Sequence, residues 1–140
     1  MRLPEAKPVA NPWRIAVAAG AAYFSLVFPA AFIVGALRTL WLAPQIGEVA
    51  AVLIEAPIIL VVSWVACGEI IRRLGVSRRT ALRAAMGFTS FILLIGAEFG
   101  LARLGLARST AEWLASYRTF SGLIGLAAQL AFAVFPLLRG

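Results

Sequence analysis

Residues 48–71 read EVAAVLIEAPIILVVSWVACGEII, and this stretch decides how the rest of the chain is interpreted. It is long enough to cross a bilayer as one helix, because a membrane-spanning helix needs about 20 mostly apolar residues. Yet Glu55 and Pro57 lie well inside the apolar run. A carboxylate at that depth costs roughly 2.5–3.5 kcal/mol on insertion scales, so we expect Glu55 to have a partner or a proton.

Composition extends this interpretation to the whole chain. Of its 140 residues, 62% are hydrophobic and 14% are charged, and the mean hydropathy is +0.94. A soluble domain is closer to half apolar and a quarter charged. The apolar excess is too large for a soluble core, which predicts an all-α polytopic membrane protein that forms a single membrane domain over residues 1–140.

The apolar runs predict an antiparallel four-transmembrane-helix bundle, with helices at about residues 13–37, 48–71, 80–104 and 113–138. A secretory signal is the rival interpretation of the first run, but that run is longer than a signal core. Residues 38–46 are expected to link the first two helices. The polar, proline-rich residues 1–12 are expected to form a flexible cytoplasmic tail.

Local signals mark several helix ends. Asn11, which precedes a proline, is typical of an N-cap. Gly75 can end one helix in the left-handed conformation and Ser77 can begin the next, which predicts a tight antiparallel hairpin. Ser109 and Glu112 fit a capping box, which we expect to start the last helix ahead of its apolar run.

Basic residues gather outside the apolar runs and give the chain a formal net charge of +7. In a soluble chain this charge would suggest nucleic acid, but no soluble domain is expected here and we predict no nucleic-acid partner. We expect anionic headgroups to meet a cytoplasmic basic turn instead, with both termini on the same side of a bacterial inner membrane. The turn consists of Arg72, Arg73, Arg78, Arg79 and Arg83.

Polar residues inside the runs fall on narrow faces of their helices, as a bundle with a polar interior requires. We predict an intramembrane polar seam that comprises Arg38, Glu48, Glu55, Glu98 and Gln129. Glu55 and Glu98 should occupy the same half of the bilayer and approach each other, with Arg38 as counter-charge. If two carboxylates meet without a cation, one of them should hold its proton.

Glycines add a second pattern. Gly96 and Gly100 flank Glu98 in a small-xxx-small spacing, and Gly122 and Gly125 share one face of the last apolar run. We predict that these four glycines are helix-packing residues. Gly20 and the alanines near it should likewise allow close approach of the first helix to its neighbours.

Catalysis finds little support in this composition. The chain has no histidine or aspartate, so it cannot supply a serine triad or a histidine-based metal site. Its one cysteine, Cys67, is expected to be a packing residue. We therefore expect neither an enzyme nor a bound cofactor or metal.

Three kinds of function remain open from the sequence. The first is a structural or accessory membrane protein held together by the polar seam. The second is a small proton- or cation-coupled transporter or channel that acts as an oligomer through Glu55 or Glu98. The third is a docking surface for a larger membrane complex.

One block of residues resembles small, uncharacterised four-span bacterial inner-membrane proteins. It consists of Gly35-Ala36-Leu37-Arg38, Pro44, Gly47-Glu48, Glu55-Ala56-Pro57 and Ser63. The resemblance implies the membrane location and brings no activity. In size the chain is also similar to small multidrug-resistance transporters and to the fluoride-channel family. The former carry their glutamate in the first span, which has no acid here, and the polar pore residues of the latter find no match.

Overall fold

The computed structural model describes residues 11–139, so most of the expected tail lies outside the described residues. Its elements are α1 (Pro12–Leu37), the π-helix η1 (Arg38–Leu42), α2 (Ala43–Ile46), α3 (Glu48–Leu74), α4 (Thr80–Gly100), the π-helix η2 (Leu101–Gly105), α5 (Thr110–Ser116) and α6 (Phe120–Leu138). The predicted all-α class is confirmed. Four helical segments are long and apolar enough to cross a membrane: Pro12–Ile46, Glu48–Leu74, Thr80–Gly105 and Phe120–Leu138.

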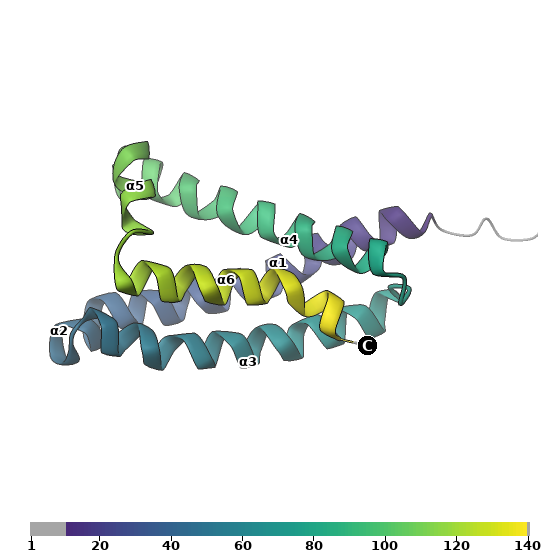
Figure 1. Ribbon diagram of the computed structural model, residues 1–140, viewed down its shortest axis with the longest axis horizontal. Helices are drawn as coiled ribbons and strands as arrows, with labels where there is room; N and C mark the ends of the chain where they lie inside the picture. Colours follow the sequence, from purple (N-terminus) through teal and green to yellow (C-terminus); the bar gives the residue numbers. More distant parts are fainter. Residues whose placement is uncertain (1–10, 140) are drawn as a thin grey trace, which may run out of the picture.

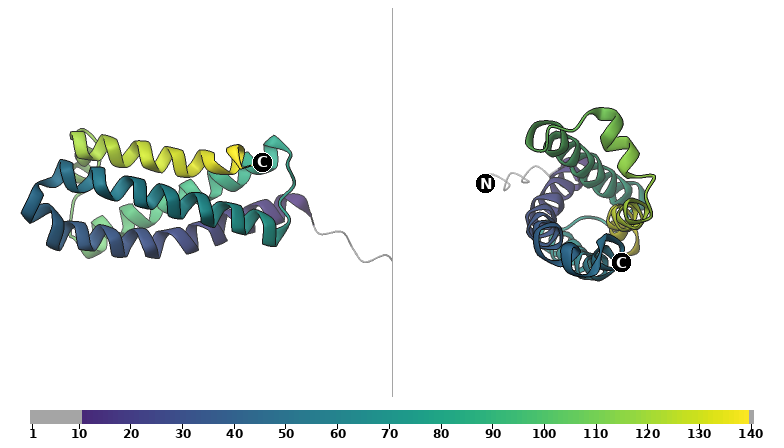
Figure 2. Two further views of the ribbon diagram at one scale, coloured as in Figure 1. Left: turned by 90° about the horizontal axis from the view of Figure 1, so that it is seen from below. Right: turned by 90° about the vertical axis from the view of Figure 1, so that its left-hand side faces the viewer.

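The long helices α1, α3, α4 and α6 lie along the longest dimension of the molecule (Figure 1). α1 packs against α3 and α4, and α6 packs against the same two helices from the other side (Figure 2). α3 and α4 are joined by a short connection, yet the main packing partners of each are α1 and α6. The expected hairpin is therefore open, because α1 and α6 lie between its two helices.

The beginning of α1 follows the sequence prediction, whereas its end does not. Asn11 Oδ1 accepts a hydrogen bond from the Trp13 N–H at 3.0 Å and caps the helix. The expected link at 38–46 is helical, because α1 continues through η1 into α2. Pro44 has no N–H to donate, and the turn before it widens so that the Ala43 N–H donates to the Arg38 carbonyl. Only Gly47, with φ of 92°, separates α2 from α3.

Of the two caps predicted for the connection between α3 and α4, the structure has one. Gly75 ends α3 in the left-handed conformation with φ of 66°, which confirms the expected C-cap. Ser77 does not cap α4. Its hydroxyl accepts from the Arg79 N–H at 3.4 Å, and α4 begins later, at Thr80.

The last apolar run holds two helices where one was expected. Ser109 Oγ accepts from the Glu112 N–H at 3.1 Å and caps α5, as predicted. α5 nevertheless ends at Ser116. Thr119 then supplies a second N-cap, since its hydroxyl accepts from the Gly122 N–H at 3.0 Å and donates to the Ser116 carbonyl at 2.8 Å. Two strong caps this close in sequence favour two helices.

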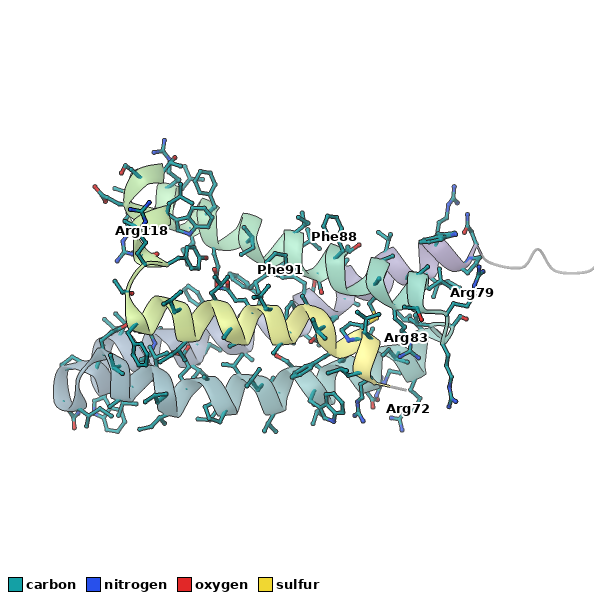
Figure 3. The ribbon with its side chains drawn as sticks, viewed as in Figure 1. Arg72, Arg79, Arg83, Phe88, Phe91 and Arg118 are labelled. Carbon is teal, nitrogen blue, oxygen red and sulfur yellow. The ribbon has the colours of Figure 1, made fainter. Side chains whose placement is uncertain are left out.

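The core lies where all four long helices meet. Tyr23 of α1 is fully buried, stacks on the Phe132 ring with centroids 4.2 Å apart, and donates to the Phe132 carbonyl at 2.9 Å. Cys67 of α3 and Met86 of α4 are also fully buried there, so Cys67 has the expected packing role. Large apolar side chains such as Phe88, which is 66% exposed, cover the outside (Figure 3).

Glycines allow two close helix contacts. A Cβ atom at Gly20 of α1 would lie 2.6 Å from the Met86 carbonyl oxygen of α4, as the sequence prediction for Gly20 requires. A Cβ atom at Gly87 of α4 would overlap the Ala133 carbonyl oxygen of α6. Among the described residues, the four glycines predicted to pack helices make no such contact. A Cβ atom at Gly96, Gly100 or Gly125 would meet nothing within 4 Å, and one at Gly122 would meet the Ser116 carbonyl and the Thr119 hydroxyl of its own turn.

Substitution of Gly87 with alanine should lower the free energy of unfolding by about 1–3 kcal/mol, because the added methyl group overlaps backbone that moves only with α6. Gly96→Ala is the matched control in the same helix. It should be neutral or stabilising by up to about 1 kcal/mol, because alanine favours helix and the space is open. Denaturant titration in detergent micelles measures both, and equal effects would contradict the Gly87 contact.

Candidate functional site

Arg38 joins the end of α1 to the beginning of α3. Its Nη1 forms an ion pair and hydrogen bond with Glu48, and its Nε forms an ion pair with Glu55. This Nε is buried, so the ion pair with Glu55 is shielded from solvent. The side chains of Arg38 and Glu55 are 22% and 17% exposed, against 52% for Glu48. The Glu55 pair is therefore the more buried of the two.

Sequence spacing explains this cluster. Glu48 is the first residue of α3, where a carboxylate is favoured by the unpaired backbone N–H groups. Glu55 follows two helical turns later and so lies on nearly the same face. Gly35, one turn before Arg38, lies beside this carboxylate, since a Cβ there would be 3.4 Å from Glu55 Oε1, at the edge of ordinary van der Waals contact. Sequence reasoning did not assign Gly35 to the site.

A second cluster joins α4 to α6 around Glu98. Gln129 Nε2 donates to both carboxylate oxygens of Glu98, at 2.7 and 2.6 Å. The Tyr117 hydroxyl, from the connection between α5 and α6, donates to Glu98 Oε2 at 3.1 Å. Burial and the nearby Glu98 carboxylate raise the pKa of Tyr117 to about 12, which keeps the phenol protonated as a donor.

The predicted seam is thus two clusters. Arg38, Glu48 and Glu55 come together between α1 and α3, and Glu98 and Gln129 come together between α4 and α6. Within residues 11–139, no ion pair or hydrogen bond joins the two clusters. Arg38 is counter-charge to Glu55 as predicted, whereas the partners of Glu98 in the described part of the chain are neutral donors. The hydrogen bond from Tyr117 to Glu98 had no signal in the local sequence.

One member of the predicted basic turn, Arg83, is buried in the structure. Its side chain was expected at the surface, but the residue is only 4% exposed. It donates to the carbonyl oxygens of Ser77 at 3.0 Å, Val76 at 3.3 Å and Pro136 at 3.1 Å, and also to that of Arg139. It therefore ties the α3–α4 connection to the end of α6. Arginine suits this position, because its five N–H donors can satisfy several carbonyls at once.

The other members of the basic turn are exposed around the α3–α4 connection. Arg72 and Arg73 both form ion pairs with Glu69, each at 2.5 Å. Figure 3 shows Arg72, Arg79 and Arg83 at one end of the molecule and Arg118 at the other. We call the first of these the basic end. Its described charged residues are Arg14, Arg72, Arg73, Arg78, Arg79, Arg83, Arg139 and one acid, Glu69.

Charge is balanced at the opposite end of the helices. Its described charged residues are Arg38, Arg103, Arg108 and Arg118, with Glu48, Glu55, Glu98 and Glu112. Both polar clusters belong to this end. The positive charge in excess within residues 11–139 therefore lies at the basic end.

Comparison of the chain with protein-family models, curated proteins and solved structures found no match.

Proposed function

We propose that the chain is an integral protein of a bacterial inner membrane, in which the four long helices cross the bilayer in antiparallel order. The outward apolar side chains of these helices support this proposal, because they would face acyl chains in place of water. The uneven distribution of arginine supports the orientation. Cytoplasmic loops carry an excess of Lys and Arg, so the basic end and both termini would be cytoplasmic.

We further propose that its role is structural or accessory and that the polar clusters hold the helices together. The observation that carries this is the placement of Arg38 between two carboxylates of α3. In a low-dielectric surrounding, a paired glutamate is tolerated where a lone one is costly. Glu98 is likewise held by donors from α6 and the α5–α6 connection. The seam carboxylates are thus engaged by the chain itself.

A transport function is the second candidate, and one observation favours it. No arginine or lysine of residues 11–139 forms an ion pair with Glu98, whose partners are the neutral side chains of Gln129 and Tyr117. A membrane carboxylate without a cation can exchange a proton at modest cost. Under this candidate function, Glu98 would take up and release the transported proton in an oligomer of the chain.

Replacement of Glu98 measures how much its hydrogen bonds contribute to stability. Glu98→Gln should leave the free energy of unfolding within about 1 kcal/mol, because an amide can still accept from Tyr117 and pair with Gln129. Glu98→Leu should cost about 1–3 kcal/mol, because it leaves both partners unsatisfied. Denaturant titration in mixed micelles measures both changes.

The same Glu98→Gln variant tests transport in vesicles. Wild-type protein is reconstituted with a pH-sensitive dye inside, and a pH gradient is applied in the presence of a potassium diffusion potential. The structural role predicts the same slow leak for wild type, Glu98→Gln and empty vesicles. A proton flux that wild type supports and Glu98→Gln abolishes would overturn the structural proposal in favour of transport.

A further inference from the structure

A pocket of about 480 Å³ opens at the basic end, within the range of roughly 300–1,000 Å³ that is usual for small-ligand sites. It lies between the end of α3, the α3–α4 connection, the start of α4 and the end of α6. Its lining includes the cations Arg72, Arg78, Arg83 and Arg139, the acid Glu69, and the apolar residues Val65, Ile71 and Val76. We propose that this pocket binds the phosphate group of an anionic glycerophospholipid.

Two of the arginines are held in place without a carboxylate. All acceptors that Arg83 finds among the described residues are backbone carbonyls, which fix its position and leave its charge in excess. Arg139 donates from Nε to the Trp64 carbonyl at 3.3 Å, and its guanidinium carbon lies 4.7 Å from the centre of the Trp64 ring. Both side chains are therefore preorganised positive charges on the pocket wall.

The remaining charges leave room for an anion. Arg78 is exposed and forms no ion pair with any residue in the described range 11–139. Arg72 pairs with Glu69, but that carboxylate is shared with Arg73, which does not line the pocket. Among the described residues that line the pocket, one shared acid thus faces four cations. A phosphate diester would add the missing negative charge and several strong acceptors.

The apolar part of the pocket favours a lipid over free phosphate. Val65 lines the pocket and is 60% exposed, and Val61, one turn earlier on α3, is 64% exposed. In the bilayer this outward face of α3 would meet acyl chains, so the inference rests on the proposed membrane insertion. A phosphate beside the arginines and chains along α3 match the two chemical halves of a phospholipid, as in basic headgroup pockets between membrane helices.

Native mass spectrometry of the full chain in neutral detergent tests the proposal. Protein is titrated with phosphatidylglycerol or phosphatidylcholine, and bound lipids are counted. We expect one phosphatidylglycerol per chain, bound at least about 10-fold more tightly than phosphatidylcholine. The double variant Arg72→Gln/Arg78→Gln should bind it about 10- to 30-fold more weakly, since each arginine near an anionic lipid contributes roughly 5-fold.

The matched control is Arg73→Gln/Arg79→Gln, which removes the same charge from the same connection but no residue of the pocket lining. It should weaken binding by less than about 3-fold. If both double variants lose the same affinity for phosphatidylglycerol, the lipid is held by general surface attraction, and the proposal that it binds in the pocket is wrong.

Two further measurements separate the sources of phosphate and the two proposals. Inorganic phosphate, compared with sodium chloride at equal ionic strength, should not raise the melting temperature. If inorganic phosphate raises the melting temperature as strongly as phosphatidylglycerol does, the site binds a free anion and the lipid assignment is wrong.

Reconstitution into neutral phosphatidylcholine vesicles tests insertion by flotation and resistance to carbonate extraction. Failure to insert contradicts the proposed function, whereas insertion without preference for phosphatidylglycerol contradicts the pocket alone.

Discussion

Replacement of Arg38 with alanine is expected to lower the free energy of unfolding by about 3–5 kcal/mol, because it leaves Glu55 in a largely buried position without its cation. Glu48 loses the same partner but is about half exposed, so it should contribute less. Titration with sodium dodecyl sulfate in mixed micelles, followed by circular dichroism, measures the change.

Arg103→Ala is the matched control, because Arg103 belongs to the same end of the molecule and is exposed. Its effect should stay within about 0.5 kcal/mol. A double-mutant cycle of Arg38→Gln and Glu55→Gln then isolates the pair. The double variant should be more stable than the sum of the single losses predicts, and additive losses would contradict a direct Arg38–Glu55 interaction.

Replacement of Arg83 with alanine should have an effect of similar size, about 3–4 kcal/mol, for a different reason. Arg83 forms no ion pair with an acid within residues 11–139. It satisfies carbonyl oxygens at the α3–α4 connection and at the end of α6, and a buried carbonyl that loses its donor costs about 1–3 kcal/mol. Hydrogen exchange should show the loss locally, as faster exchange at the end of α6.

Substitution of Arg83 with lysine separates the contribution of its hydrogen bonds to stability from that of its charge. Arg83→Lys keeps the charge, but its single ammonium group cannot reach carbonyls on both sides, so it should recover less than half of the lost stability. Arg79→Ala is the exposed control from the same connection and should be nearly neutral. Full recovery by lysine would contradict the hydrogen-bonding role.

The long helices could be predicted because their signals are local. Apolar runs marked the four helical segments, and Asn11, Gly75 and Ser109 marked ends that the structure confirms. The errors at residues 38–46 and at the last run came from local signals that compete. Pro44 widens a helical turn without ending the helix, and Thr119 supplies a second N-cap inside an apolar run.

The Arg38–Glu55 pair of the candidate site was predictable because its partners are close in sequence. Arg38 and Glu55 lie on neighbouring helices joined by one short connection, so depth and face were enough to pair them. The bonds of Arg83 to Pro136 and of Tyr117 to Glu98 depend on which helices become neighbours. Sequence periodicity does not contain that information, because it gives the face of each helix and not the order of helices around the bundle.

The short connection at Gly47 has a consequence for biogenesis. Under the proposed membrane insertion, Arg38, Glu48 and Glu55 are all synthesised before α4 begins, so α1 and α3 would leave the translocon as a pair whose carboxylates already have their cation. The partners of Glu98 among the described residues, Tyr117 and Gln129, are both made after it. The third hydrophobic segment should therefore remain at the insertion machinery until the fourth has emerged.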